Sequence, residues 1–101
     1  MKYLFFLIIL ISSPLYAVDL VSSLYSCTHK DNDLVRQVKI IHKDKGCQVT
    51  YTKAFGTVNE QTKSLWRAKN STEYCDKKGL AFVEEKLQQE FGWVCINQIG
   101  N

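Results

Sequence analysis

The sequence predicts an α+β domain, in which one helix packs on one face of an antiparallel sheet of about five strands held by two disulfides. Three observations lead to this prediction. The first half of the domain consists of segments rich in β-branched residues that polar turns separate. One stretch with helical spacing follows, with a short apolar segment after it. The four cysteines lie far apart in the chain, which favours disulfides.

Residues 1–17 are expected to be a secretory signal peptide rather than part of the domain. Lys2 provides a positive start, nine consecutive apolar residues follow from Tyr3 to Ile11, and Ala17 is a small residue suited to cleavage. The apolar run is too short to span a membrane as a helix, which takes about 20 residues. We therefore expect residues 18–101 to form one domain without a membrane span, located in the periplasm or outside the cell.

Four strands are expected before the helix. Each is an alternating or β-branched apolar segment between polar turn residues. The turn at residues 43–46 is tight, and Gly46 is expected to supply the positive φ of a hairpin turn. The stretch 54–62 is the longest irregular loop. The expected strands span residues 20–28, 34–42, 47–52 and 64–69.

The helix is expected to begin after Asn70, because Glu73 follows three positions later in the pattern of a capping box. Gly79 weakens a helix by up to about 1 kcal/mol relative to alanine. Gly92 is suited to end the helix, and residues 93–96 are expected to form the last strand. The apolar face of the helix is expected to consist of Leu80, Val83, Leu87 and Phe91.

The four cysteines are expected to form two disulfides, since gaps of 20, 28 and 20 residues do not resemble the close pairs of a zinc site. If the first three strands form a meander, Cys27 and Cys47 lie about 20 Å apart, beyond the reach of a disulfide. The helix rises about 22 Å and separates Cys75 from Cys95. The favoured pairs are therefore Cys47–Cys75 and Cys27–Cys95, which place the last strand beside the first. Without the meander, Cys27–Cys47 and Cys75–Cys95 are the alternative.

Composition and charge exclude several classes of protein. The formal net charge is +3 with both signs mixed along the chain, and 46% of the residues are hydrophobic and 23% charged. These values are ordinary for a globular protein and argue against a disordered tail or a nucleic-acid binder. We expect no cofactor and no metal.

A small secreted hydrolase or effector enzyme is the alternative function, and it would depend on His29 or His42 with nearby acids.

Two groups of residues are candidates for binding. Loops on a rigid scaffold often carry binding residues, and the long loop offers Phe55, Gly56, Val58 and Asn59. The alternative, which we favour for this loop, is that Phe55 packs back onto the sheet. The aromatic residues form the second group. They either belong to the core, which we favour, or form an exposed recognition face on the side of the sheet without the helix. This second group consists of Tyr25, Tyr51, Trp66 and Trp93.

The sequence also contains a pattern of cysteines and tryptophans that extends over most of the expected mature chain. Its elements include Leu65-Trp66-Arg67-Ala68 and Gly92-Trp93-Val94-Cys95, together with the other three cysteines. This pattern resembles a family of small exported four-cysteine proteins of Gram-negative bacteria, known as a domain of unknown function. The resemblance implies export and a common fold, but no activity. Because a small disulfide-bonded domain without a recognisable catalytic set of residues favours binding over catalysis, we expect an exported binding or inhibitory module without catalytic activity. We expect its partner to be another exported or cell-envelope protein.

Overall fold

The sheet contains five strands, each antiparallel to its neighbours, in the order β4-β3-β2-β1-β5. The computed structural model describes residues 19–99, so the predicted signal peptide lies outside the described residues. The last strand lies beside the first, and the predicted fold class and sheet order are confirmed. The strands are β1 (Leu20–His29), β2 (Asn32–His42), β3 (Cys47–Lys53), β4 (Gln61–Ala68) and β5 (Val94–Asn97).

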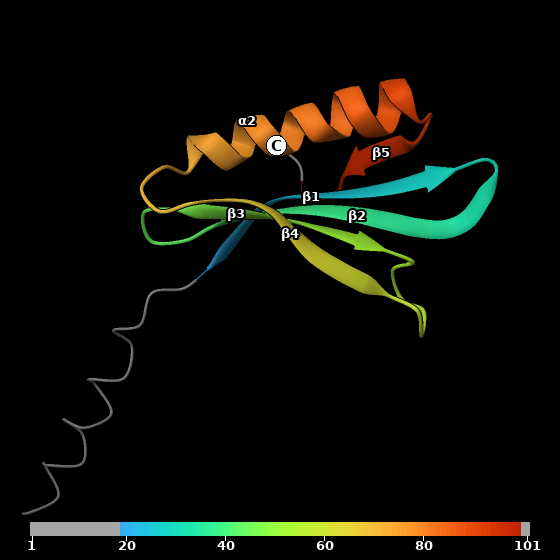
Figure 1. Cartoon of the computed structure of the whole chain (residues 1–101), viewed down its shortest axis with the longest axis horizontal. Coiled ribbons are helices and arrows are strands. Elements are labelled where there is room, and N and C mark those ends of the chain that lie inside the picture. The colour runs from blue at the N-terminus through green and yellow to red at the C-terminus, as the bar shows by residue number, and fades with distance from the viewer. Residues whose placement is uncertain (1–18, 100–101) are drawn as a thin grey trace, which may run out of the picture.

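One helical rod covers one face of this sheet (Figure 1). It begins as helix α2 (Glu73–Ala81) and continues without a break as the π-helical segment η2 (Phe82–Glu90). The predicted apolar face is partly wrong, because Leu80 is 41% and Phe91 is 52% exposed. Leu80 is one position beyond Gly79 and therefore points about 100° away around the axis. The buried residues recur at every fourth position: Cys75, Gly79, Val83 and Leu87.

The start of the helix differs from the predicted capping box. The Tyr74 N–H donates to the Ser71 hydroxyl at 3.1 Å, so Ser71 caps the helix, one residue after Asn70. Thr72 already has helical dihedral angles, with φ −89° and ψ −30°. Counted from Ser71, the third position is Tyr74 rather than Glu73, and the reciprocal bond of a capping box does not form. The helix ends as predicted, since Gly92 follows it with φ +76°.

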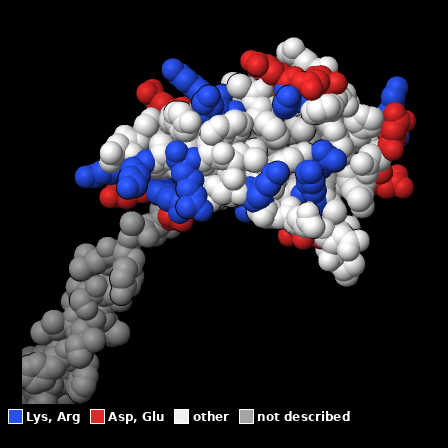
Figure 2. Space-filling model, viewed as in Figure 1, with Lys and Arg blue, Asp and Glu red and all other residues white. Residues whose placement is uncertain are grey.

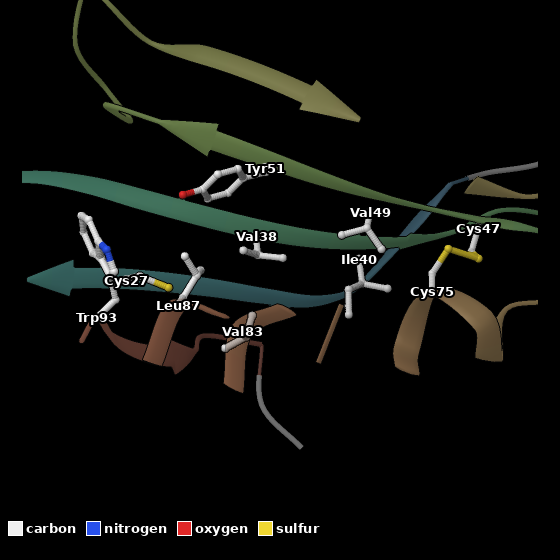
Figure 3. Close-up of a cluster of buried hydrophobic side chains, with 10 residues drawn as sticks. All are labelled: Cys27, Val38, Ile40, Cys47, Val49, Tyr51, Cys75, Val83, Leu87 and Trp93. Carbon is white, nitrogen blue, oxygen red and sulfur yellow. A yellow bond between two sulfur atoms is a disulfide. The ribbon is translucent and has the colours of Figure 1, made fainter. Parts of the chain in front are cut away.

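The core lies between the helix and the sheet (Figure 3). Strand alternation directs Val38 and Ile40 of β2 towards the helix, and both are at most 2% exposed. Tyr51 and Trp93 are buried in the same cluster, with 5% and 6% exposure, while Tyr25 and Trp66 pack against it. The favoured prediction of a core role for the aromatic residues is therefore correct, and the alternative of an aromatic face on the uncovered side is wrong. The buried cluster comprises Cys27, Val38, Ile40, Cys47, Val49, Tyr51, Cys75, Val83, Leu87 and Trp93.

Two nested disulfides close the fold at opposite ends of the core (Figure 3). Cys27 and Cys95 are directly paired residues of β1 and β5, and their Cα atoms are 4.0 Å apart. Cys47 at the start of β3 is bonded to Cys75 in the first turn of α2, with 5.9 Å between the Cα atoms. The predicted pairing is confirmed, and the sequential alternative is wrong.

The turn between β2 and β3 contains Gly46, for which we predicted a positive φ. This prediction is wrong, since positive φ among the described glycines occurs at Gly56 and Gly92. Gly46 is required for space instead. A Cβ at this position would collide with the backbone carbonyl oxygen of Ala68, the last residue of β4.

Candidate interaction surface

The loop between β3 and β4, residues 54–60, is held in shape by its own hydrogen bonds. The Phe55 N–H donates to the Val35 carbonyl at 2.9 Å and ties the loop to β2. The Gly56 N–H donates to the Glu60 carboxylate at 2.7 Å, and the Thr57 hydroxyl donates to the Ala54 carbonyl at 2.8 Å. Ala54 takes the left-handed conformation at φ +52°, which is uncommon for a residue with a side chain. These hydrogen bonds therefore hold the loop in a defined conformation.

This loop exposes four of the residues that the sequence predicted as binding residues. Figure 1 shows that the loop descends from the sheet on the side away from the helix. Val58 at its tip is 100% exposed and Phe55 is 44% exposed. Gly56 and Asn59 are exposed as well. Ala54 is only 8% exposed and anchors the base of the loop.

The two predicted tryptophans do not lie with the loop. Trp93 is buried under the helix, where its ring packs edge-on to His29 with 5.1 Å between the ring centroids. Trp66 is paired with Val49 across β3 and β4 and is half-buried. It meets Phe82 of η2 edge-on at 5.9 Å. Of the two tryptophans, only Trp66 offers surface to a partner.

Trp66 lies in a groove between the helical rod and β4. The groove has a volume of about 540 Å³, and Leu65, Trp66 and Phe82 form its apolar floor with Ala81. The rod and β4 diverge towards the loop 54–60 (Figure 1). The backbone of α2 lies close to β4, and the backbone of η2 lies close to β5 at the other side of the sheet. Its rim consists of Lys78, Glu85, Lys86 and Glu90.

Basic side chains gather along the β4 side of the molecule. Figure 2 shows Lys and Arg in a row below the helix, with most Asp and Glu on the helix and at the ends of the molecule. Residues 36–69 contain eight basic and two acidic residues, whereas residues 73–90 contain three basic and five acidic residues. The weak net charge of the whole chain therefore hides a separation of charge between sheet and helix. The exposed members of this row, which we call the basic row, are Lys43, Lys45, Lys53, Lys63, Arg67 and Lys69.

The two histidines lie at opposite ends of β2. His29 is paired with Asn32 at one end and His42 with Cys47 at the other, about 33 Å away along the strand. The Asp31 N–H donates to Nδ1 of His29, so the ring proton lies on Nε2 and is donated to the Phe91 carbonyl at 3.0 Å. Both nitrogens of His29 thus hold main-chain groups of the neighbouring turn and helix end.

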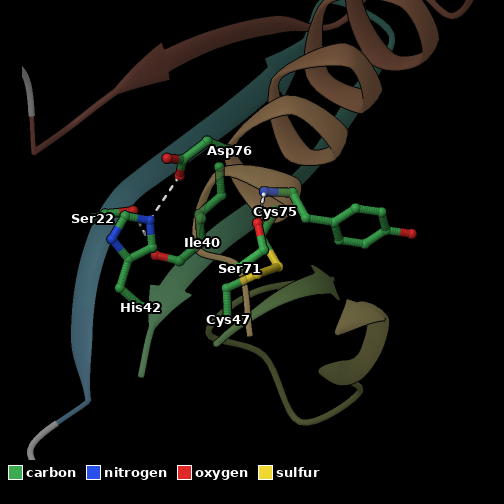
Figure 4. A network of polar contacts seen from close by, with 8 residues as sticks. Ser22, Ile40, His42, Cys47, Ser71, Cys75 and Asp76 are labelled. Atoms are coloured by element: carbon green, nitrogen blue, oxygen red, sulfur yellow. Dashed lines mark hydrogen bonds and ion pairs between the residues drawn. A yellow bond between two sulfur atoms is a disulfide. The ribbon is translucent and has the colours of Figure 1, made fainter. Parts of the chain in front are cut away.

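His42 forms a contact that the sequence did not predict. Its Nε2 lies 2.8 Å from the Asp76 carboxylate, beside the Cys47–Cys75 disulfide (Figure 4). The nearby Ser22 hydroxyl donates to the Ile40 carbonyl at 3.3 Å. The pair joins the end of β2 to the first turn of the helix. Residues 34 positions apart give no local sequence signal for such a contact.

Arg36 is a second residue that the sequence reasoning missed. Its guanidinium donates to the Tyr51 hydroxyl at 2.6 Å and lies 4.5 Å from the centroid of the Trp93 ring. The period of β2 could have indicated this position, because Arg36 shares a face with Val38 and Ile40. Arg36 thus covers the end of the core beside Trp93, and its charged group stacks on aromatic rings.

Neither a metal centre nor a known relative adds to this description. Within residues 19–99, no three His, Cys, Asp or Glu side chains are grouped so that they could hold a metal ion. In the same part of the chain, no helix is long and apolar enough to cross a membrane. Comparison with known proteins found no matching family, no curated protein and no solved structure.

Proposed function

We propose that the protein is a non-catalytic binding or inhibitory module, that it works in the periplasm or outside the cell, and that the loop 54–60 contacts its partner. One observation carries the proposal. The loop is hydrogen-bonded into a defined shape and yet presents Val58 with 100% exposure and Phe55 with 44% exposure. Burying an exposed aliphatic or aromatic side chain contributes about 1.5–3 kcal/mol. A loop that is already ordered loses little further entropy on binding.

Export is the second part of the proposal. The two disulfides support it, because disulfides persist in oxidising compartments and are rare where thiols are kept reduced. The expected signal peptide at residues 1–17 supports it independently. We also propose that the chain belongs with the small exported four-cysteine proteins that it resembles, and that its partner is an exported or cell-envelope protein.

The alternative, a secreted hydrolase, has no support in the arrangement of the histidines. The ring nitrogens of His29 are engaged by the Asp31 N–H and the Phe91 carbonyl. Nε2 of His42 is engaged by Asp76, which in turn belongs to the helix start. Each ring holds structural elements together, and we therefore favour binding over catalysis.

A capture experiment tests the contribution of the loop. The mature protein is immobilised and exposed to periplasmic extract and culture medium of the source cells, alongside the variants Val58→Asp and Val94→Asp. Val94 on β5 is 61% exposed and is the matched control for the same substitution. We expect Val58→Asp to reduce capture at least tenfold, because an unpaired carboxylate in an interface is strongly unfavourable. Val94→Asp should retain the partner.

Two outcomes would contradict the proposal. Equal capture by both variants would remove the loop from the contact surface. Failure of the wild-type protein to retain any partner above the level of an unrelated disulfide-bonded protein would contradict the binding function itself. Melting temperatures of both variants must match the wild type for either result to count.

A further inference from the structure

We propose that the outer edge of β4, together with the groove beside it, binds an extended acidic segment of the partner, which adds to the sheet as a further strand. The inference rests on the proposed binding function and names the chemistry of the partner. Its three supports are the free edge of β4, the apolar groove and the basic row.

The first support is the edge itself. β4 is the terminal strand of the sheet, and within residues 19–99 no strand pairs with its outer side. Such an edge carries unpaired N–H and C=O groups that a second chain can bond. β4 has eight residues, whereas β5 at the opposite edge has four. Only β4 is long enough for an added strand of ordinary length.

The second support is the groove, because an added strand needs places for its side chains. Successive side chains of a strand alternate between its two faces, so every second residue on the new strand would face the helix side. On that side lie Leu65, Trp66 and Phe82, which form the apolar floor between β4 and the rod. Trp66 is half-buried and keeps part of its ring available for an apolar anchor.

The third support is the positive charge along β4, which favours an acidic segment over a second copy of this strand. Lys53, Lys63, Arg67 and Lys69 of the basic row lie on or beside β4, and none of them takes part in the ion pairs of the described residues. A second copy of β4 would add the positive charges of its own Lys63 and Arg67 to this edge, and like charges on paired strands are destabilising. An acidic strand places carboxylates against these cations instead.

Lysines on an edge strand also have a purely protective role, since they prevent aggregation of the sheet. That role explains Lys63 and Arg67 but not the aromatic groove next to them. The lysines and the groove together discriminate between partners: the cations reject a basic or identical strand, and the apolar floor rejects an acidic chain without apolar side chains.

Direct binding of synthetic peptides tests the inference on the oxidised mature protein. The first probe is a peptide of about eight residues that alternates glutamate with leucine, a length typical of a strand. Comparison probes of equal length contain lysine in place of glutamate, glutamate alone, or thymidine nucleotides. Binding is measured by calorimetry, by tryptophan fluorescence and by hydrogen exchange of the β4 amides.

We expect only the glutamate-leucine peptide to bind with protection of the β4 amides and a change in fluorescence. The change should vanish in Trp66→Phe, which leaves Trp93 in place. The pair Lys63→Glu with Arg67→Glu should weaken binding at least tenfold. The matched pair Lys30→Glu with Lys77→Glu changes two exposed cations elsewhere and should leave binding unchanged.

Several results would overturn the inference. Equal binding of oligoglutamate or oligothymidine would show attraction of charge alone, and binding without protection of β4 would exclude strand addition. The capture experiment separates this inference from the proposed function. If Lys63→Glu with Arg67→Glu keeps a partner that Val58→Asp loses, the binding function holds and the β4 site is wrong. If the peptide binds but no natural partner is captured, the function is wrong.

Discussion

Gly79 of helix α2 lies directly on Ile40 of strand β2. A Cβ on this glycine would come 2.6 Å from Cδ1 and 2.8 Å from Cγ1 of Ile40. Ile40 is 2% exposed and sits in the packed core, so its side chain has no free space to move into. The helix approaches the sheet closely here because position 79 carries no side chain. A residue that weakens the isolated helix therefore sets the distance between the two layers of the fold.

Replacing Gly79 with alanine should destabilise the protein in spite of the better helix propensity of alanine. Propensity favours alanine by about 1 kcal/mol, whereas overpacking of a core contributes about 1–3 kcal/mol in the opposite direction. We expect a net decrease in the free energy of unfolding in urea. In the Ile40→Val background the decrease should be smaller, because the nearest methyl group is absent. Additive effects in this double-mutant cycle would show that the two residues do not limit the packing.

The two disulfides should differ in their contribution to stability. Cys47–Cys75 joins residues 28 positions apart and Cys27–Cys95 joins residues 68 positions apart. The chain-entropy relation then gives about 3.6 and about 4.4 kcal/mol respectively. We expect the double variant Cys27→Ala with Cys95→Ala to melt at a lower temperature than Cys47→Ala with Cys75→Ala. The reverse order would show that native contacts, and not loop length, decide the difference. Peptide mapping without reduction verifies the remaining bond in each variant.

The disulfide pairing and sheet order could be predicted because they follow from lengths. The span of β2 separates Cys27 from Cys47, and the rise of the helix separates Cys75 from Cys95. A prediction based on these distances stays correct when the bounds of an element are wrong by one or two residues. The prediction of the apolar helix face does not, since a shift from Gly79 to Leu80 turns the side chain from the core to solvent.

The candidate site was predictable in part for a similar reason. Chain connectivity alone places Phe55 and Val58 in the longest loop, and the structure exposes both. The separation of Trp66 from Trp93 depends on the register of β4 and on the final strand, which local patterns do not specify. The pairs His42–Asp76 and Arg36–Trp93 arise only when segments distant in the chain pack together.

Arg36 should stabilise the end of the core beside Trp93 through the shape of its guanidinium group as well as through its charge. Its guanidinium donates to the Tyr51 hydroxyl and stacks on Trp93, two interactions worth about 1–3 kcal/mol together. Arg36→Ala should reduce the free energy of unfolding by this amount and shift the fluorescence of Trp93, read in a Trp66→Phe background. Arg36→Lys should recover only part of the loss, because an ammonium lacks the planar fork. Full recovery by lysine would assign the effect to charge alone.

Tyr25 should make stability fall at alkaline pH. Burial raises the pKa of its phenol above the ordinary value of 10.0; a hydrogen bond with Ser23 opposes this, and the negative charges of Glu84 and Asp76 add to it. The folded state therefore favours the neutral phenol. The stability that this preference provides is complete below pH 10.0 and is lost as the pH rises through the raised pKa of the folded state. The free energy of unfolding should thus decrease over this window, and Tyr25→Phe should make the decrease shallower. Tyr74→Phe, the same substitution at a residue that is 39% exposed, is measured alongside to account for the effect of the substitution itself. Identical slopes for Tyr25→Phe and the wild type, measured by urea unfolding at each pH, would exclude Tyr25 as the source of the alkaline loss.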